Sequence, residues 1–187
     1  MEEIDFTELT RYAKSFTGLT KEHEILLAEA GTALKPALPD VTEGFYATLQ
    51  SIDKTAPFID GRLDALKQTH LKWLEGLFTG PYNETYAQSM YQVGQVHVKV
   101  HLPVEFMSGG MSLIANELIA LVSKTYPGEP KRAADLLSAI NAVMGFSLLI
   151  MQQSYQISSL SAELDRFLAI TGMSRKLFNN LAGAYHN

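Results

Sequence analysis

The 187-residue chain contains no cysteine, which excludes disulfide bonds, thiolate metal ligands and cysteine nucleophiles. It also carries little charge, since charged residues make up 19% of the chain and the net charge is −5. Such mild acidity gives no reason to expect nucleic acid or an anionic membrane as a partner. Apolar residues make up 47% of the chain, which is enough for one domain with a hydrophobic core.

Signals for export and for hydrolysis are missing as well. The first residues, MEEIDFTELT, lack the basic start and apolar stretch of a signal peptide. Apolar runs such as GFSLLIM are shorter than a membrane span, so we expect a cytoplasmic protein. The chain has no G-x-S-x-G motif, no phosphate-binding glycine loop and no pair of carboxylates on a shared inward face. We therefore do not expect this chain alone to be an enzyme.

Helical periodicity dominates the sequence, and no segment shows the convincing alternation of a strand. Turn signals at 36–40 (PALPD), at Gly80-Pro81 and at Tyr126-Pro127-Gly128 divide the chain. This pattern predicts an all-α fold in which the helices cross one another. The predicted helices cover about 6–16, 20–35, 40–51, 60–79, 83–101 and 104–125, with a long last segment from about 129 through LFNNL.

Two histidines lie within apolar stripes of consecutive predicted helices. At 100° per residue, His70 falls inside the stripe that contains Leu66 and Leu74, with charged residues on the other face. In the next helix His97 lies on an apolar face in the same way. The other members of that face are Tyr86, Met90, Val93 and Val100. Each ring needs partners for its nitrogens, because an unpaired buried polar group costs about 1–3 kcal/mol.

Three explanations of the two rings are compatible with these patterns. The rings are core histidines bonded to carbonyl or hydroxyl groups, or they bind a bare metal ion, or they flank a haem. His97 and His101 have helical chelating geometry, but catalytic zinc and non-haem iron usually add a carboxylate, which the inward face of 60–79 lacks. A haem needs an axial histidine and an apolar slot. The two stripes supply such a lining, with Met90, Val93 and Trp73 among its members.

Residues 66–106 form the most informative segment, LKQTHLKWLEGLFTGPYNETYAQSMYQVGQVHVKVHLPVEF. It combines a Leu-Lys helix start, a tryptophan, a Phe-x-Gly turn and the segment VGQVHVKVHLP. In these features, and in GFYATLQ at 44–50, the chain resembles the globin domain of globin-coupled sensors, a protoglobin-like family. The resemblance implies a globin fold, with a sensor globin domain at 1–160 and a helical linker toward an output domain at 161–187.

The same resemblance implies roles for individual residues. His97 matches the proximal iron ligand of the family. Tyr46, which follows Phe45, matches a distal tyrosine that donates a hydrogen bond to the bound ligand. Leu66 and Thr69 match distal positions that tune ligand access and polarity.

This chain departs from the family pattern at three positions. Lys99 stands where the family usually has arginine, and His101 stands where it typically has glycine. His70 replaces the apolar residue that most oxygen-binding relatives carry. Some members close the sixth coordination position of the iron with a histidine on this helix. We therefore expect His70 either to ligate the iron opposite His97 or to bond a haem propionate or Tyr46.

By this resemblance we expect a haem-based sensor of O₂, CO or NO, or of redox state. Without cysteine the attachment motif C-x-x-C-H is impossible, so we expect non-covalent haem b. We also expect a homodimer formed through helices at about 104–125 and 133–158. Two alternatives remain open, a six-coordinate haem protein that transfers electrons and a globin-fold signalling module without haem.

Overall fold

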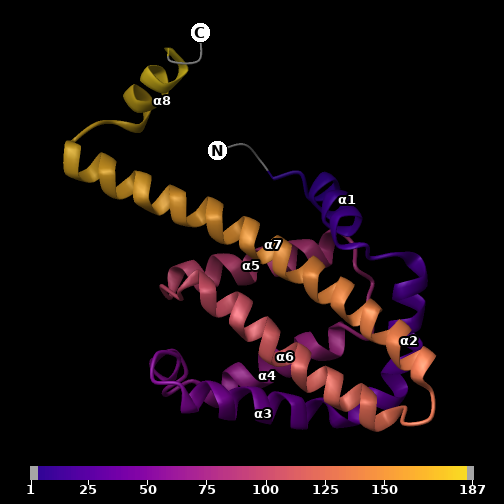
Figure 1. Cartoon of the computed structure of the whole chain (residues 1–187). Coiled ribbons are helices and arrows are strands. Elements are labelled where there is room, and N and C mark those ends of the chain that lie inside the picture. The colour runs from indigo at the N-terminus through magenta and orange to yellow at the C-terminus, as the bar shows by residue number, and fades with distance from the viewer. Residues whose placement is uncertain (1–3, 185–187) are drawn as a thin grey trace.

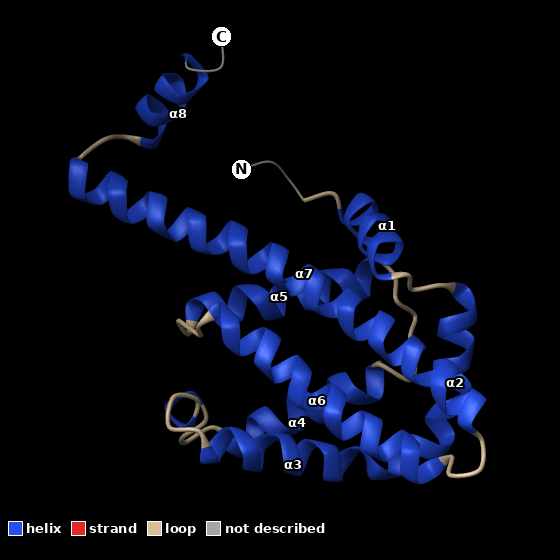
Figure 2. Ribbon diagram, in the orientation of Figure 1, coloured by secondary structure: helices blue, strands red, loops and turns tan. Residues whose placement is uncertain are grey.

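The computed structural model describes residues 4–184, and within that range it contains helices and loops but no strand (Figure 2). The α-helices are α1 (Phe6–Thr17), α2 (Lys21–Leu34), α3 (Leu38–Ser51), α4 (Leu63–Gly76), α5 (Glu84–Lys99), α6 (Val104–Thr125), α7 (Pro130–Thr171) and α8 (Arg175–Ala184). The predicted all-α class is confirmed. Residues 1–3 of the predicted sensor domain and residues 185–187 of the predicted linker lie outside the described residues.

Side-chain caps begin several helices where the sequence supplies them. The Asp5 carboxylate accepts hydrogen bonds of 2.9 and 3.0 Å from two backbone N–H groups in the first turn of α1. The side chain of Asn83 accepts one of 3.2 Å from the backbone of Tyr86 in α5. These caps satisfy N–H groups that have no partner within their helix. Asn83 thus sets the start of the helix that carries His97.

The structure corrects two predicted boundaries. The break predicted at 36–40 is a 3-10 turn, η1 (Lys35–Ala37), which leads directly into α3 at Leu38. Pro39 lies in the first turn of α3, where its missing N–H group removes no helical hydrogen bond. Helix α4 begins and ends three residues inside the predicted range 60–79.

The last predicted segment, which the sequence left undivided, consists of two helices. Helix α7 runs for 42 residues and ends at Thr171, after which Gly172 adopts a left-handed conformation with φ 67°. Glycine takes this conformation without steric penalty and often ends helices. In Figure 1 the C-terminal part of α7 projects beyond the other helices, and α8 lies at its far end.

Helix α7 is the central packing element, since α1, α2, α5 and α6 all pack against it. Its contact with α5 is the most extensive. A Cβ atom on Gly94 would lie only 2.4 Å from the backbone oxygen of Met151, so this crossing requires glycine. The hydroxyl of Ser154 donates a 2.5 Å hydrogen bond to the carbonyl of Tyr91. Helix α5 is therefore fixed to α7 by direct backbone contact and by hydrogen bonding.

Helices α6 and α7 are long and apolar enough to cross a membrane, by length and composition alone. The expectation that no segment reaches that length was wrong by this measure, because it counted only uninterrupted apolar runs. Core helices of ordinary globular proteins satisfy the same criterion. Of the most apolar window, 56% is buried within the chain for α7 but only 22% for α6. Much of the apolar surface of α6 is thus left uncovered by its own chain.

Candidate functional site

His70 lies on α4 and contacts three residues of α3. Its Nδ1 is 3.1 Å from the hydroxyl oxygen of Thr42. The ring of Phe45 stacks on the imidazole, with centroids 4.7 Å apart and planes 13° from parallel, and Tyr46 meets it edge-on at 5.6 Å. Trp73, one turn along α4, lies 5.7 Å away. The imidazole is therefore held on several sides by aromatic rings and by one hydroxyl.

The second nitrogen of His70, Nε2, is buried and has no hydrogen-bond partner among the described residues. Burial lowers the pKa of His70 to about 4, because desolvation disfavours the charged imidazolium. The ring is neutral near pH 7, which is the form that binds metals. A buried unpaired nitrogen is energetically costly, so Nε2 marks a point where a bound group would be stabilising.

His97 lies on the inward face of α5, as predicted. Met90 on that face is buried, and Val93 and His97 are half-buried, whereas the glutamines and Lys99 on the opposite face are exposed. The Nδ1 of His97 is buried without a hydrogen-bond partner in the described part of the chain. Burial lowers the pKa of His97 as well, so this ring too is neutral near pH 7.

The two histidine-bearing helices pack against different neighbours. Helix α4 packs on α3, whereas α5 packs on α7 and α1. Within residues 4–184, α4 and α5 have no extensive contact with each other. The face of α4 with His70 and the face of α5 with His97 therefore do not pack mainly against each other. A group that binds between the two histidines would require this.

The other predicted site residues divide into two sets. Phe45 and Tyr46 are buried, Leu66 is half-buried, and burial raises the pKa of Tyr46 to about 12, which keeps its phenol protonated. Thr69 is exposed, and its hydroxyl donates a 2.6 Å hydrogen bond to the carbonyl of Ala65 in its own turn of α4. Thr69 does not share the buried surface of Phe45 and Tyr46, and its distal role stays a prediction.

Sequence reasoning missed Thr42. The residue is buried, and its hydroxyl joins α3 to the ring of His70. Its spacing offered a signal, because Thr42 lies four residues before Tyr46 and so on the same face of α3. Nothing in the sequence, however, shows that this face meets α4 at His70.

His101 has a structural explanation of its own. Its φ is 56°, the left-handed region, a conformation that suits the glycine expected there from the family resemblance. Histidine is among the few other residues enriched in that conformation. The side chain is exposed and does not share the buried face of His97. The alternative of a bare metal ion chelated by His97 and His101 therefore has no support, and no group of three metal-ligating side chains occurs within the described residues.

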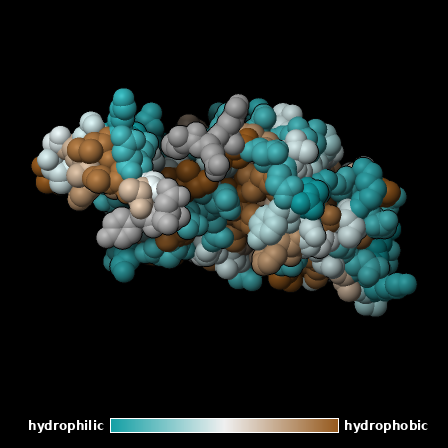
Figure 3. Space-filling view, turned by 90° about the horizontal axis from the view of Figure 1, so that it is seen from above, coloured by the Kyte–Doolittle hydropathy of each residue, from teal (hydrophilic) through white to brown (hydrophobic). Residues whose placement is uncertain are grey.

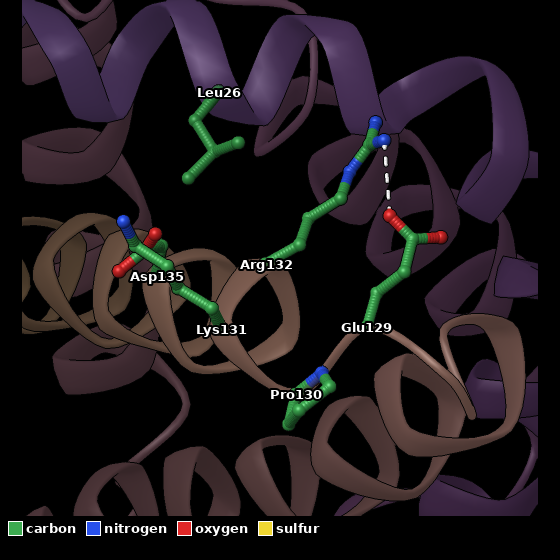
Figure 4. A pocket seen from close by; sticks show the side chains of 6 residues that line it. All are labelled: Leu26, Glu129, Pro130, Lys131, Arg132 and Asp135. Carbon is green, nitrogen blue, oxygen red and sulfur yellow. Dashed lines mark hydrogen bonds and ion pairs between the residues drawn. The ribbon is translucent and has the colours of Figure 1, made fainter.

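A surface hollow of about 390 Å³ lies apart from the histidines, between α2 and the first turns of α7. Figure 4 shows Leu26 opposite Arg132, which forms an ion pair of 3.5 Å with Glu129. Its charged side chains are exposed to solvent, and such pairs contribute little energy. We assign no function to this hollow.

The residues around the two histidines fit a haem. Two neutral imidazoles on different helices each have an unpaired buried nitrogen. Their neighbours are apolar and aromatic, and the chain has no cysteine. Histidine ligation and an apolar surrounding are what non-covalent haem requires.

Comparisons with known proteins identify the family. The model of the protoglobin family matches residues 7–160, so the chain belongs to the protoglobin family. The globin domain of the Geobacter sulfurreducens globin-coupled sensor superposes with a TM-score of 0.72 at 26% identity, covering 78% of this chain and 96% of that one. The ferrous globin domain of E. coli DosC gives 0.65 at 16% identity, covering 76% and 99%. No curated protein matches the sequence.

These matches confirm the predicted globin fold and the resemblance to globin-coupled sensors. The chain is thus a globin domain of the protoglobin family, and it is similar to the globin domain of a globin-coupled sensor. Family membership implies haem binding and gaseous ligands. The roles of individual residues stay predictions.

Proposed function

We propose that the chain is a haem-based sensor of O₂, CO or NO, or of redox state, and that His97 is the proximal ligand of a non-covalent haem b. One observation carries the proposal. Two neutral imidazoles on different helices each have a buried nitrogen without a hydrogen-bond partner in the described part of the chain. A satisfied core histidine would have bonded that nitrogen to a carbonyl or hydroxyl.

Each residue of the candidate site has a separate task. If haem is bound, it would supply an iron atom that binds a diatomic ligand. His97 offers a neutral nitrogen from a helix that is fixed to α7. Leu66, Met90 and Val93 exclude water from the apolar surroundings. Tyr46, with its pKa raised to about 12, keeps its hydroxyl hydrogen and can donate it to a polarised ligand.

We propose His70 as a displaceable sixth ligand. Its Nε2 is buried and unpaired in the described structure, and α4 packs mainly on α3. A gas that takes the place of His70 would change the position of α4 relative to α3, which is the kind of two-state element that a sensor needs. Tyr46 and Phe45 lie at the contact that would change.

Absorption spectra of the reconstituted full chain test the function. We expect an intense Soret band after addition of haem, a six-coordinate low-spin spectrum in the ferric or ferrous state, and conversion by CO in the ferrous state. A chain that takes up no haem would instead be a globin-fold signalling module. A ferrous form that resists CO would favour the electron-transfer alternative.

We also propose a homodimer through α6 and the 133–158 part of α7. Helix α6 is apolar but little buried within its own chain, and Ile119 on it is 47% exposed. Figure 3 shows hydrophobic surface in the middle of the face seen from above and at one end of the molecule. Apolar surface of this kind is commonly covered by a partner.

Sedimentation of a matched pair of variants tests the dimer. Ile119→Glu places a charge on the proposed interface and is expected to give monomers. Ile25→Glu on α2, where isoleucine is 51% exposed, is expected to remain dimeric. Dimers in both variants would contradict this interface.

We propose residues 1–160 as the sensor globin domain and 161–187 as a linker toward an output domain, acting in the cytoplasm. The family match ending at residue 160 supports this division. From residue 160 on, α7 carries the exposed apolar side chains of Leu160, Phe167 and Ile170, which suit contact with another domain.

A further inference from the structure

A hydrogen bond between Thr42 and His70 joins α3 to α4, in addition to the ion pair of Lys67 with Glu43 on the surface. The hydroxyl oxygen of Thr42 is 3.1 Å from Nδ1 of His70, and the side chain of Thr42 is only 3% exposed. The opposite ring nitrogen, Nε2, is buried and unpaired within the described residues. One edge of the imidazole is thus bound to α3, and the other is left for a further group.

Stacking and hydrogen bonding restrict different motions of this ring. Phe45 lies 13° from parallel to the imidazole, so stacking fixes the plane of the ring but does not distinguish its two edges. A 180° flip about the Cβ–Cγ bond would keep the stack but replace Nδ1 by a carbon atom opposite Thr42. The buried hydroxyl would then lose its partner at a cost of about 1–3 kcal/mol.

We propose that Thr42 is a positioning residue for His70: its hydroxyl holds Nδ1, so that Nε2 faces the bound group, in either tautomer of the ring. The inference rests on the proposed function only in identifying that group as haem. Phe45 fixes the plane of the ring. Thr42 selects the flip state in which Nε2, rather than a ring carbon, faces the bound group.

A hydroxyl is suited to this task because it can donate or accept. When Thr42 donates to Nδ1, the proton of the neutral ring is on Nε2, which can then donate to a ligand. When Nδ1–H donates to Thr42, Nε2 presents the lone pair that a metal requires. The exchange moves one ring proton between the nitrogens and rotates one hydroxyl, so atoms and charge are conserved. A valine of the same shape supports neither state.

Two substitutions separate this role from simple packing. Thr42→Val keeps the volume but removes the hydroxyl, and Thr42→Ser keeps the hydroxyl but removes a methyl group. In the full chain without haem, long-range ¹H–¹⁵N spectra report the state of each imidazole nitrogen. We expect Thr42→Val to shift the Nδ1 signal of His70 and to leave that of His97 unchanged, and we expect Thr42→Ser to resemble the parent.

In the haem-loaded chain, the six-coordinate fraction provides the second measurement. Thr42→Val is expected to lower the equilibrium constant for His70 ligation about fivefold, the equivalent of one ordinary hydrogen bond, with rescue by Thr42→Ser. In a His70→Ala background the same substitution should have no effect on CO binding.

The proposal is overturned by unchanged His70 signals in Thr42→Val without haem, or by a serine variant that behaves like valine. It is overturned equally by a Thr42 effect that persists in the His70→Ala background. Failure to bind haem would contradict the proposed function alone, because the spectra of the haem-free chain still test whether Thr42 controls the ring of His70.

Discussion

Helices α4 and α5 carry the two histidines, and the rest of the molecule holds them in contrasting ways. Helix α5 meets α7 backbone to backbone at Gly94 and is bonded to it through Ser154. Helix α4 has its principal contact with α3, where the ring of His70 is itself part of the interface. His97 therefore lies on a helix that is tightly packed against α7, whereas His70 is itself part of the smaller contact between α3 and α4.

The largest expected difference between the two sides is in haem retention. His97→Ala is expected to lose most of the haem, because it removes the proposed proximal ligand. His70→Ala is expected to keep the haem and to bind CO roughly tenfold faster, since no side chain competes for the iron. Absorbance after gel filtration and flash photolysis measure these effects. His101→Ala is the control and should match the parent, and equal haem loss from His70→Ala and His97→Ala would refute the assignment.

Glycine substitutions compare the packing of the two helices directly. Gly94→Ala on α5 places a Cβ atom 2.4 Å from the oxygen of Met151, so we expect a loss of about 2–3 kcal/mol in unfolding free energy. Gly76→Ala on α4 meets nothing within 4 Å and is expected to be neutral or to stabilise by about 0.5 kcal/mol. Chemical denaturation measures both, and similar values would show that the α5–α7 crossing is not tight.

Hydrogen-bond deletions provide a smaller contrast. The hydroxyl of Tyr155 on α7 donates a 2.7 Å hydrogen bond to the carbonyl of Leu102, just after α5. Tyr155→Phe leaves that carbonyl unpaired and should destabilise the fold by about 1 kcal/mol. Thr69→Ala on α4 removes only an exposed bond within one helix and should change stability by less than about 0.5 kcal/mol. Thermal unfolding that ranks Thr69→Ala as the more harmful would reverse the comparison.

The smallest expected effect on stability at neutral pH comes from a buried tyrosine that ionises only at alkaline pH. The hydroxyl of Tyr86 on α5 lies 2.7 Å from that of Ser147 on α7, and burial raises the pKa of Tyr86 to about 12. A folded-state pKa above the unfolded value of about 10 stabilises the fold fully below pH 10, and this stabilisation declines as pH rises from 10 through 12. Tyr86→Phe should therefore flatten the loss of stability in this range. Parallel pH profiles for variant and parent would contradict the expectation.

The parts of the structure that depend on local pattern could be predicted from the sequence. The inward faces of α4 and α5 follow from helical spacing, and the structure places His70 and His97 on them. The end of α7 at Gly172 was missed, because apolar residues continue on both sides of it. The bond between Thr42 and His70 could not be predicted, since it depends on how α3 and α4 meet. The left-handed conformation of His101 was likewise hidden, because no glycine marks it.

Helix α7 has a mechanical consequence that follows from its length. At about 1.5 Å per residue, its stretch from the crossing at Met151 to Thr171 is a stiff arm of roughly 30 Å. If α7 tilted about that crossing, each degree of tilt would displace its C-terminal end sideways by about 0.5 Å. Tilts of α7 that are too small to change the packing of the core would thus produce larger displacements at its C-terminal end, where α8 follows.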